Sequence, residues 1–359
     1  MPTILIMAGG TGGHVFPALA LARRLREQSV EVVWLGTRRG IEARLVPAEA
    51  IPVEWLSVGG LRGKALSTRL AAPWRLTVAL WQALRVMGRR RPALVVGLGG
   101  FVTGPGGVAA WLTGRPLVIH EQNAIAGFTN RCLAHLAREV LEAFPGSFSA
   151  GVRTVVIGNP VRREIAALPK PAERLAGRGG AVRLLIIGGS QGAVRLNTVV
   201  PEALSRIAGI RWDVRHQAGE RWVGGCRESY AGAGVAAQVT AFIDDMAEAY
   251  AWADLVICRA GALTVSELAA AGLGAVLVPF PAAVDDHQTH NARHLVGAGA
   301  AVLIPDRELS AGRLAAELER LCADRATLLD MAERARALAR PDATERLASA
   351  CLAHARRAA

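Results

Sequence analysis

Acidic residues are missing from one long stretch of this 359-residue chain. Between Trp55 and His120 there is no Asp or Glu, although nine Lys and Arg residues lie there. Residues 1–160 hold 18 basic and 8 acidic residues, a net charge of +10, whereas the remainder holds 24 and 22, a net charge of +2. We therefore expect the first half of the chain to prefer an anionic partner surface.

Other absences exclude whole classes of protein. The five cysteines are scattered without a close pair or a metal-ligand spacing, which favours a reducing compartment. No uninterrupted apolar run reaches the roughly 18–20 residues of a membrane-spanning helix. The N-terminus lacks the basic region of a signal peptide. Low-complexity tracts and heptad or three-residue periods are missing too, which excludes disordered, coiled-coil and collagen-like chains. We expect a protein that is soluble or lies on a membrane surface.

Short β-rich apolar runs alternate with helical patterns, which is typical of α/β proteins. Continuous apolar strands separated by helices predict parallel sheets that are covered on both faces. The predicted strands are Thr3–Ala8, Val30–Gly36, Val53–Val58, Ala93–Gly97, Leu117–His120, Val155–Gly158, Val182–Gly188, Trp212–Gln217, Val235–Ala241, Leu255–Cys258, Ala275–Pro279 and Ala301–Ile304.

A weak internal repeat favours two Rossmann-like domains. Leu5–His14 and Leu185–Ala193 each combine a strand, a glycine turn and a helix start, and they lie 180 residues apart. We predict an N-terminal domain over 1–158, a C-terminal domain over 159–338, and a last helix over 339–359 that packs back on the N-terminal domain. Two such domains that face each other would leave a cleft at the carboxyl ends of both sheets, where open α/β sheets bind ligands.

Three glycine clusters at strand ends are candidate anion sites: Gly9–Gly13, Gly97–Gly107 and Gly188–Gly192. Glycines let backbone N–H groups approach a phosphate, and the helix N-termini behind them carry positive partial charge. No acidic residue ends the second strand, which disfavours a nicotinamide dehydrogenase, and no P-loop Lys-Ser/Thr follows the turns. The clusters predict one diphosphate and one further phosphate-bearing ligand. For any single cluster, a tight strand-to-helix turn is the alternative.

Polar residues at strand ends are the candidate catalytic and binding groups. His14 follows the first glycine turn and either accepts a proton from a hydroxyl nucleophile or caps and packs its helix. His120–Asn123 ends a strand and either binds sugar hydroxyls or caps the helix that begins near Phe128. Glu267 lies about one turn into a helix, where it either grips a ribose diol or acts only as a favourable charge near the helix N-terminus.

Taken in order, these motifs resemble one family, the MurG family of bacterial peptidoglycan glycosyltransferases. The resemblance runs from Met1 to about Ala300 and is carried by Gly9–His14, His120–Asn123, Gly158–Arg162, Gly188–Ala193, Ala262–Glu267 and Asp286–Gln288. It implies a GT-B fold and an inverting transfer of GlcNAc from UDP-GlcNAc to the C4 hydroxyl of undecaprenyl-diphospho-muramyl-pentapeptide. This step converts lipid I to lipid II in peptidoglycan synthesis, and so serves cell wall biogenesis, cell shape and cell division.

The resemblance also implies roles for individual residues. His14 corresponds to the base for the acceptor hydroxyl, with Glu121 in reserve. The uracil would meet the backbone of Ile243, the ribose Glu267, the donor diphosphate Ser190 and Arg162, and the GlcNAc hydroxyls Gln288 and Asn123. Further donor contacts are implied for Thr11, Gly12, Gly13, Ala262, Leu263, Thr264, Val265 and Ser266. The acceptor diphosphate falls to the loop that contains Gly99, Gly100, Gly104 and Gly106.

Two residues depart from the pattern of the family, Phe101 and Gly274, and Gly274 stands where Pro is common. Phe101 stands where the family often has Tyr, so no chemical role is assigned to it. No metal or other cofactor is expected, because a helix N-terminus near Ser190 can stabilise the departing UDP. The histidines of Asp285–Asn291 lack the order of zinc-binding helices. Two alternatives stay open: a GT-B glycosyltransferase with another acceptor, and a nucleotide-sugar-binding regulator without chemistry.

The helix predicted near residues 69–87 carries an aromatic and basic stripe. Leu70, Trp74, Val78, Trp81 and Arg85 recur at i, i+4 and i+7, with Arg75, Gln82 and Arg89 on another face. Such a helix suits an anionic bilayer surface, or it is an ordinary crossover helix that buries this stripe on the sheet. We predict a peripheral protein on the cytoplasmic face of the bacterial inner membrane, with other cell-wall synthesis proteins as further partners. No nucleic-acid-binding module is present, so nucleic acid is not expected as a partner.

Overall fold

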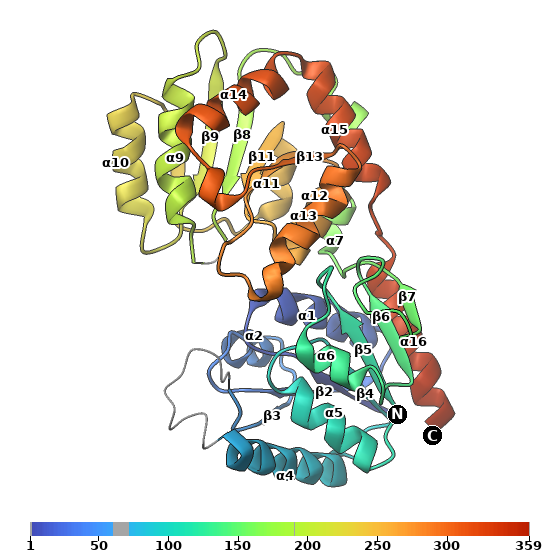
Figure 1. Ribbon diagram of the computed structural model, residues 1–359. Helices are drawn as coiled ribbons and strands as arrows, with labels where there is room; N and C mark the ends of the chain where they lie inside the picture. The colour runs from blue at the N-terminus through green and yellow to red at the C-terminus, as the bar shows by residue number, and fades with distance from the viewer. Residues whose placement is uncertain (1, 60–71, 190, 359) are drawn as a thin grey trace. The chain divides into compact units, whose positions relative to one another are not determined.

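The computed structural model describes residues 2–59, 72–189 and 191–358, and the chain divides into two compact units (Figure 1). Unit 1 consists of Met1–Val161 together with Pro341–Ala359, and unit 2 consists of Arg162–Arg340. The divisions fall two or three residues beyond the boundaries expected from the sequence. The last helix, α16 (Ala343–Ala358), lies against α1 (Gly12–Glu27) within unit 1.

Unit 1 is built on a seven-stranded parallel sheet in the order β3-β2-β1-β4-β5-β6-β7. Its strands are β1 (Thr3–Met7), β2 (Glu31–Gly36), β3 (Val53–Trp55), β4 (Leu94–Gly97), β5 (Leu117–Glu121), β6 (Glu139–Glu142) and β7 (Thr154–Val156). The other described helices are α2 (Glu42–Ala48), α4 (Ala72–Arg90), α5 (Thr103–Leu112) and α6 (Phe128–Leu133). The strand order reverses between β1 and β4, the position at which open α/β sheets bind ligands.

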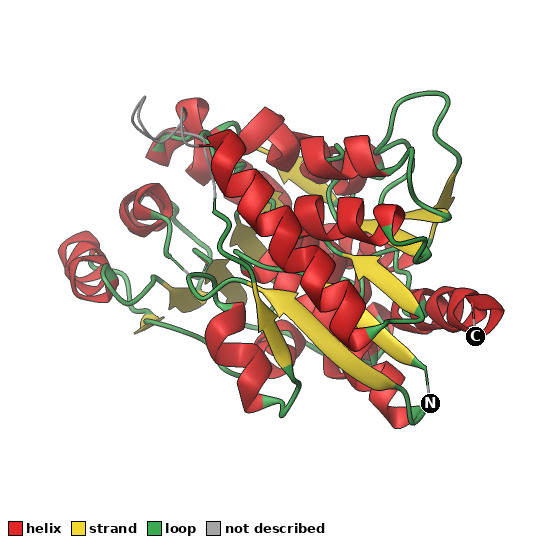
Figure 2. Ribbon diagram, turned by 90° about the horizontal axis from the view of Figure 1, so that it is seen from below, coloured by secondary structure: helices red, strands yellow, loops and turns green. Residues whose placement is uncertain are grey.

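Both faces of this sheet are covered by helices (Figure 2). Ile4 and Ile6 of β1 point to the face covered by α1 and α16, and the alternate residues Leu5 and Met7 point to the face covered by α4 and α5. All four side chains are fully buried. At about 25 cal/mol per Å² of apolar surface, this two-sided burial stabilises β1 as the centre of the unit.

Unit 2 repeats the design with a six-stranded parallel sheet in the order β10-β9-β8-β11-β12-β13. Its strands are β8 (Val182–Ile187), β9 (Trp212–Gln217), β10 (Gln238–Thr240), β11 (Leu255–Cys258), β12 (Gly274–Leu277) and β13 (Ala301–Leu303). Its helices are α7 (Arg163–Ala166), α8 (Pro171–Leu175), α9 (Val194–Ser205), α10 (Val223–Ala233), α11 (Met246–Trp252), α12 (Ala262–Ala271), α13 (His287–Gly297), α14 (Ala311–Cys322) and α15 (Arg325–Ala337), with short 3-10 turns at Val284–Asp286 and Asp306–Glu308. Here the order reverses between β8 and β11, and the prediction of two Rossmann-like parallel sheets is confirmed.

The sequence analysis missed one strand, β6. Charged residues stand at both of its ends, so it shows neither an apolar run nor a simple alternation. The Glu142 side chain is nevertheless buried, because its carboxylate accepts hydrogen bonds from the backbone N–H groups of Gly146 (3.2 Å) and Ser147 (3.0 Å) and from the Thr154 hydroxyl (3.0 Å). Glu139 pairs with His354 of α16 at 2.8 Å. Polar contacts thus fix a strand that hydrophobicity does not reveal.

Helix α4 buries a different face from the stripe singled out in its sequence. Its buried residues are Ala79, Ala83, Val86 and Met87, whereas Trp74 and Trp81 are 72% and 55% exposed. The expectation that a crossover helix would bury the tryptophan stripe is therefore wrong: α4 packs on the sheet with the other side. Leu70, the first residue of the stripe, lies outside the described residues.

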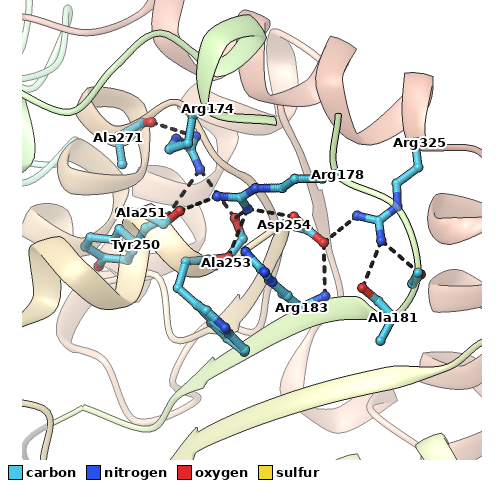
Figure 3. A network of polar contacts seen from close by, with 12 residues as sticks. Arg174, Arg178, Ala181, Arg183, Tyr250, Ala251, Ala253, Asp254, Ala271 and Arg325 are labelled. Carbon is cyan, nitrogen blue, oxygen red and sulfur yellow. Dashed lines mark hydrogen bonds and ion pairs between the residues drawn. The ribbon is translucent and has the colours of Figure 1, made fainter. Parts of the chain in front are cut away.

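Partly buried arginines hold α11 and α12 of unit 2 in place (Figure 3). Arg174 and Arg178 donate to backbone carbonyls at the C-terminal ends of these helices, including those of Tyr250, Ala251, Trp252 and Ala271. Asp254, 1% exposed, accepts from Arg178 (2.8 Å), from Arg325 and from the Arg183 backbone N–H (3.0 Å). Cations at helix C-termini satisfy the orphan carbonyls and oppose the helix dipole. The two helices that carry the unit 2 site are thereby fixed.

Candidate active site

Two glycine turns of unit 1 lie pressed together where the strand order reverses. Helix α1 begins directly after the first turn, with Thr11 as its N-cap. In the second turn Gly100 has φ +88°, and a Cβ there would lie 2.4 Å from the carbonyl oxygen of Gly9. Only glycine permits this approach of the two backbones. The loops after β1 and β4 are therefore packed directly against each other.

Glu42 of α2 holds the first turn in place, and sequence reasoning missed it. Its fully buried carboxylate accepts from the Gly10 N–H at 2.9 Å, and from the N–H (3.0 Å) and hydroxyl (2.7 Å) of Thr37. The Gly10 N–H is thus committed to a carboxylate and is not offered to a phosphate. No short motif marks Glu42, because its partners come from the ends of two different strands.

His14, at the start of α1, rests on the second glycine turn. A Cβ at Gly99, which has φ +99°, would lie 2.6 Å from the imidazole Nδ1. The His14 Nδ1 lies 3.0 Å from Oε1 of Gln122, in the loop after β5. Within the described part of the chain the other ring nitrogen, Nε2, meets no hydrogen-bond partner. The imidazole is therefore held on one side and open on the other.

His120 and Gln122 continue this contact into the core. Nε2 of His120 lies 2.9 Å from the Gly158 carbonyl oxygen, and Nε2 of Gln122 lies 3.0 Å from Nδ1 of His120 and 3.0 Å from its carbonyl oxygen. The His120 side chain is fully buried. Burial lowers the pKa of His120 to about 4, so its imidazole is neutral near pH 7.

Glu121, expected as a reserve base, has another role in the structure. Its side chain is 2% exposed. One carboxylate oxygen accepts from the backbone and side-chain amides of Asn123 (2.9 and 3.2 Å), and the other accepts from the Gly127 N–H (3.1 Å) and the Asn130 amide (2.8 Å). These four hydrogen bonds occupy both oxygens of the buried carboxylate and order the loop. Glu121 therefore positions Asn123, and this geometry argues against proton exchange with a substrate.

The glycines expected to form an acceptor diphosphate loop do not share one environment. Gly99 and Gly100 lie in the turn after β4, as expected, but Gly104 and Gly106 are inside α5. A Cβ at Gly106 would lie 2.3 Å from the sulfur of Met7, so this glycine lets α5 pack closely on the sheet. Its assignment to the loop is wrong, because a glycine-rich run does not reveal where its helix begins. Phe101, in the same turn, is 55% exposed.

In unit 2 the corresponding turns follow β8 and β11. Gly192 has φ +75°, and a Cβ there would lie 2.2 Å from the Ala218 carbonyl oxygen. Ser190 lies outside the described residues. Helix α12 begins at Ala262 after Gly261, without a side-chain cap. Its first N–H groups are therefore available to an anion.

The residues after Ala262 contribute unequally to this helix start. Val265 is fully buried in the core, so its side chain cannot touch a ligand, whereas Leu263 and Thr264 are partly exposed. The Ser266 hydroxyl donates back to the Ala262 carbonyl at 3.0 Å. What this run offers a ligand is mainly backbone N–H and the Thr264 side chain.

Glu267 and Arg162, expected on different parts of a nucleotide, are paired in the structure. Oε1 of Glu267 accepts from Nε (3.1 Å) and Nη2 (2.8 Å) of Arg162, and Oε2 accepts from the Tyr250 hydroxyl at 3.2 Å. Burial raises the pKa of Glu267, against the opposing effect of Arg162 and Tyr250. Burial and the Glu267 charge also raise the pKa of Tyr250 well above its ordinary value, so its hydroxyl stays protonated and donates.

Gln288 and Ile243 present polar groups near the same sheet edge. Oε1 of Gln288 accepts from the backbone N–H groups of Phe280 (2.9 Å) and Ala260 (3.2 Å), while its amide nitrogen has no acceptor among the described residues. Ile243 lies between β10 and α11, and its N–H and C=O meet no partner in residues 2–59, 72–189 and 191–358. Across those same residues, no three His, Cys, Asp or Glu side chains converge as metal ligands do.

The comparisons with known proteins agree with this architecture. Residues 4–142 match the glycosyltransferase family 28 N-terminal domain, and residues 183–347 match the family 28 C-terminal domain. The chain therefore belongs to glycosyltransferase family 28, a family of sugar-transferring enzymes.

Individual members of the family are similar to this chain over nearly its whole length. The chain is 59% identical over 350 residues (97% of this chain, 98% of the relative) to the UDP-N-acetylglucosamine--N-acetylmuramyl-(pentapeptide) pyrophosphoryl-undecaprenol N-acetylglucosamine transferase of Nitrosococcus oceani. It is 60% identical over 354 residues (98% and 99%) to the protein of the same name from Alkalilimnicola ehrlichii. The crystal structure of Acinetobacter baumannii MurG has a TM-score of 0.86 at 41% identity and covers 98% of this chain, which covers 100% of it. The resemblance to the MurG family expected from the motifs is confirmed, and with it the GT-B fold class.

Proposed function

We propose that this enzyme transfers GlcNAc from UDP-GlcNAc to the C4 hydroxyl of undecaprenyl-diphospho-muramyl-pentapeptide, inverting the anomeric carbon. The observation that carries the proposal is full-length identity of 59% and 60% to proteins named for this transfer. In a single displacement, the acceptor oxygen bonds to the anomeric carbon as the bond to the UDP oxygen breaks, and the α-linked donor gives a β-linked product.

On the acceptor side, His14 is the general base. Its Nε2 has no protein partner within the described residues, so a sugar hydroxyl can approach it and pass on a proton as the new glycosidic bond forms. The adjoining turn of Gly99 and Gly100, with the start of α5 and Gly104 behind it, receives the acceptor diphosphate through backbone N–H groups.

On the donor side, unit 2 offers a complementary set of groups. The uncapped start of α12 holds the diphosphate and stabilises the charge that develops on departing UDP. Ser190, which lies outside the described residues, is a further contact of the diphosphate in this proposal. The backbone of Ile243 pairs with the uracil edge, and the Gln288 amide donates to a GlcNAc hydroxyl. In unit 1, Asn123, Thr11, Gly12 and Gly13 are the residues that the family resemblance assigns to the donor. The chemistry needs no metal.

Glu267 binds the ribose diol in this proposal, and its pairing with Arg162 gives that step a specific form. Both carboxylate oxygens already accept protein hydrogen bonds. When the ribose hydroxyls donate to Glu267, Arg162 can turn its guanidinium to the diphosphate, the ligand to which the resemblance assigns it. The Arg162 guanidinium and the Tyr250 hydroxyl both oppose the rise that burial causes in the pKa of Glu267, and so favour the carboxylate that accepts from the ribose.

Unit 1 also carries a surface that suits a lipid-linked acceptor. Trp74 and Trp81 of α4 and Trp111 and Leu112 of the neighbouring α5 are between 53% and 72% exposed, and the Arg85 guanidinium lies 4.7 Å from the centre of the Trp81 ring. Exposed tryptophans beside arginines favour an anionic bilayer surface. Among the described helices, none is both long and apolar enough to cross a membrane. We propose peripheral binding to the cytoplasmic face of the bacterial inner membrane, where other cell-wall synthesis proteins are further partners.

The decisive experiment measures transfer of labelled GlcNAc from UDP-GlcNAc to lipid-linked muramyl-pentapeptide. We expect a β-linked lipid product and UDP release that depends on the acceptor. UDP release with a different acceptor only would favour another glycosyltransferase activity. Tight UDP-GlcNAc binding without any acceptor-dependent release would favour a regulator without chemistry.

A further inference from the structure

Three polar side chains of unit 1 form a line from the protein interior to His14. The line begins at the Gly158 carbonyl and passes through the His120 ring and the Gln122 amide to Nδ1 of His14, with consecutive distances of 2.9, 3.0 and 3.0 Å. His14 lies 108 residues from Gln122 in the sequence, so the fold alone brings them together. No role is assigned to the line by the proposed transfer reaction.

The direction of each hydrogen bond in the line can be derived. The Gln122 amide nitrogen lies 3.0 Å from the His120 carbonyl oxygen, an atom that can only accept. The amide NH2 must therefore face inward, which turns Oε1 toward His14. An amide oxygen can only accept as well, so Nδ1 of His14 must carry the hydrogen. The opposite amide orientation would place two oxygens against each other.

The His120 ring supports the same direction independently. Its Nε2 faces the Gly158 carbonyl and so carries a hydrogen, which leaves Nδ1 of the neutral ring as an acceptor for the second Gln122 N–H. Burial keeps this ring neutral, because it lowers the pKa of His120 to about 4. Two acceptors of His120, its carbonyl oxygen and its Nδ1, thus both fix the NH2 end of the Gln122 amide, and the direction of the oxygen end toward His14 follows.

We propose that Gln122, oriented by His120, is a positioning residue that holds neutral His14 in its Nδ1–H tautomer and so keeps the lone pair on the open Nε2. The functional part rests on the proposed transfer reaction, in which Nε2 of His14 takes the acceptor proton. A ring nitrogen is available as a base only in the tautomer that leaves it unprotonated. The other tautomer would present an N–H to the acceptor hydroxyl and could not receive its proton.

An amide suits this task better than a carboxylate would in one respect. A carboxylate in the same place would also accept from Nδ1–H, but its charge would favour the imidazolium form of His14. An amide oxygen selects the tautomer without adding charge. Gln122 thus fixes which ring nitrogen of His14 carries the hydrogen, and it places no charge beside the ring.

The tautomer can be read directly from ring 15N–1H correlations of the full-length protein labelled with 15N-histidine, without substrate. The chain has eight histidines, and the His14 signals are identified by their loss in His14→Ala. His120 and the buried His216 serve as references, since Nε2 of each faces an oxygen acceptor, Gly158 O at 2.9 Å and Asn197 Oδ1 at 3.1 Å. We expect His14 to show the Nδ1–H pattern, opposite to both. A His14 ring with the Nε2–H pattern would overturn the proposal.

Variants of Gln122 and His120 test the functional part. Gln122→Met keeps the length of the side chain without its amide; we expect it to abolish the Nδ1–H preference and lower kcat about 10- to 100-fold, with the KM for UDP-GlcNAc nearly unchanged. His120→Leu should act in the same direction, whereas His120→Asn, whose oxygen can replace Nδ1 as acceptor, should retain most of the tautomer preference and of kcat. Gln217→Met, which removes an equally buried amide of unit 2, is the spectroscopic control and should leave the His14 signals unchanged.

The outcomes separate this proposal from the proposed function. Normal kcat in Gln122→Met, or a retained Nδ1–H pattern there, would overturn the positioning role while the transfer reaction stands. The predicted tautomer in a protein that transfers no GlcNAc would overturn the function while the assignment of the His14 hydrogen stands. Equal loss of kcat in His120→Leu and His120→Asn, at equal folded fractions, would exclude His120 from the line.

Discussion

In unit 1 the side chains that lead to His14 form a hydrogen-bonded line of two imidazoles and an amide, whereas in unit 2 an arginine and a glutamate form an ion pair. Burial lowers the pKa of His120 to about 4, and the bonds of this residue to the Gln122 amide fix which way the amide faces. Arg162 and Glu267 meet at 2.8 Å, and the proposed donor binding exchanges this contact for bonds to the nucleotide. The two units share a strand order around their reversal points, so the contrast lies in the side chains and not in the topology.

The difference teaches how one topology supports two tasks. A proton acceptor needs a defined lone pair, and neutral directional contacts supply it without shifting its charge state. A polyanionic, hydroxyl-rich ligand is bound best by charged groups, because these form the stronger charge-assisted hydrogen bonds. Each unit therefore presents at its sheet edge the kind of group that its proposed substrate requires.

The largest effect should come from breaking the hydrogen-bonded line at its outer end. His14→Ala should lower turnover about 10²–10⁴-fold and leave UDP-GlcNAc affinity nearly intact, because only the acceptor hydroxyl loses its proton acceptor. Steady-state kinetics against pH check this, and the acid limb of the profile should flatten. His354→Ala, remote in sequence and paired with Glu139, is a matched control. A variant that keeps more than about a tenth of the turnover with an unchanged acid limb would place the base elsewhere.

Breaking the charged pair of unit 2 should affect binding and not the base. Glu267→Ala should weaken UDP-GlcNAc binding by about 1.5–3 kcal/mol, roughly 10- to 100-fold, since charge-assisted bonds to the ribose are lost. Calorimetry with a 2′-deoxyuridine donor should show a much smaller penalty on the variant than on the parent. Glu248→Ala, which removes an exposed partner of Arg215, is the control. Equal discrimination by both proteins would show that Glu267 does not contact the ribose.

The surfaces of the two units can be compared by charge reversal. Arg75→Glu with Arg85→Glu should weaken binding to anionic vesicles by about 1 kcal/mol per reversed arginine, and added salt should have the same effect. Arg89 is left intact because it pairs with Glu54. Arg307→Glu, 86% exposed in unit 2, should change little. Sedimentation with vesicles at low salt checks the prediction, which fails if the double variant binds like the parent.

The smallest effect should follow removal of one hydroxyl. Tyr250→Phe deletes the donor to Glu267 and should weaken UDP-GlcNAc binding by about 1 kcal/mol, roughly fivefold. Because the pKa of Glu267 is raised, protonation should begin to weaken donor binding at a higher pH than for an exposed glutamate. Without the Tyr250 hydroxyl, which opposes that rise, the loss should begin at a still higher pH. Titrations of affinity against pH on both proteins measure this, and coincident curves would contradict it.

The sequence predicts those parts of the structure that depend on neighbouring residues, and it does not predict contacts between residues far apart in the chain. Strands such as β1 and β11 follow from local apolar runs. The glycine turns after β1 and β8 indicate that a helix follows each of them. β6 depends instead on hydrogen bonds between the Glu142 carboxylate and the turn that follows the strand, and no local sequence pattern indicates these bonds. Gln122 reads as one polar residue in a loop, since its partner His14 lies 108 positions away. The Arg162–Glu267 pair joins positions 105 apart and is equally invisible from spacing.

The contact between His14 and Gly99 has a consequence for how this enzyme could change its acceptor. The imidazole of His14, the proposed base, lies against the backbone of Gly99, and the same turn is the one proposed to hold the acceptor diphosphate. A side chain added at position 99 to grip a different headgroup would push the imidazole out of register with Gln122. A substitution in this turn would therefore change acceptor binding and the position of the proposed base at the same time. Residues that contact the acceptor away from His14 can be changed without that coupling.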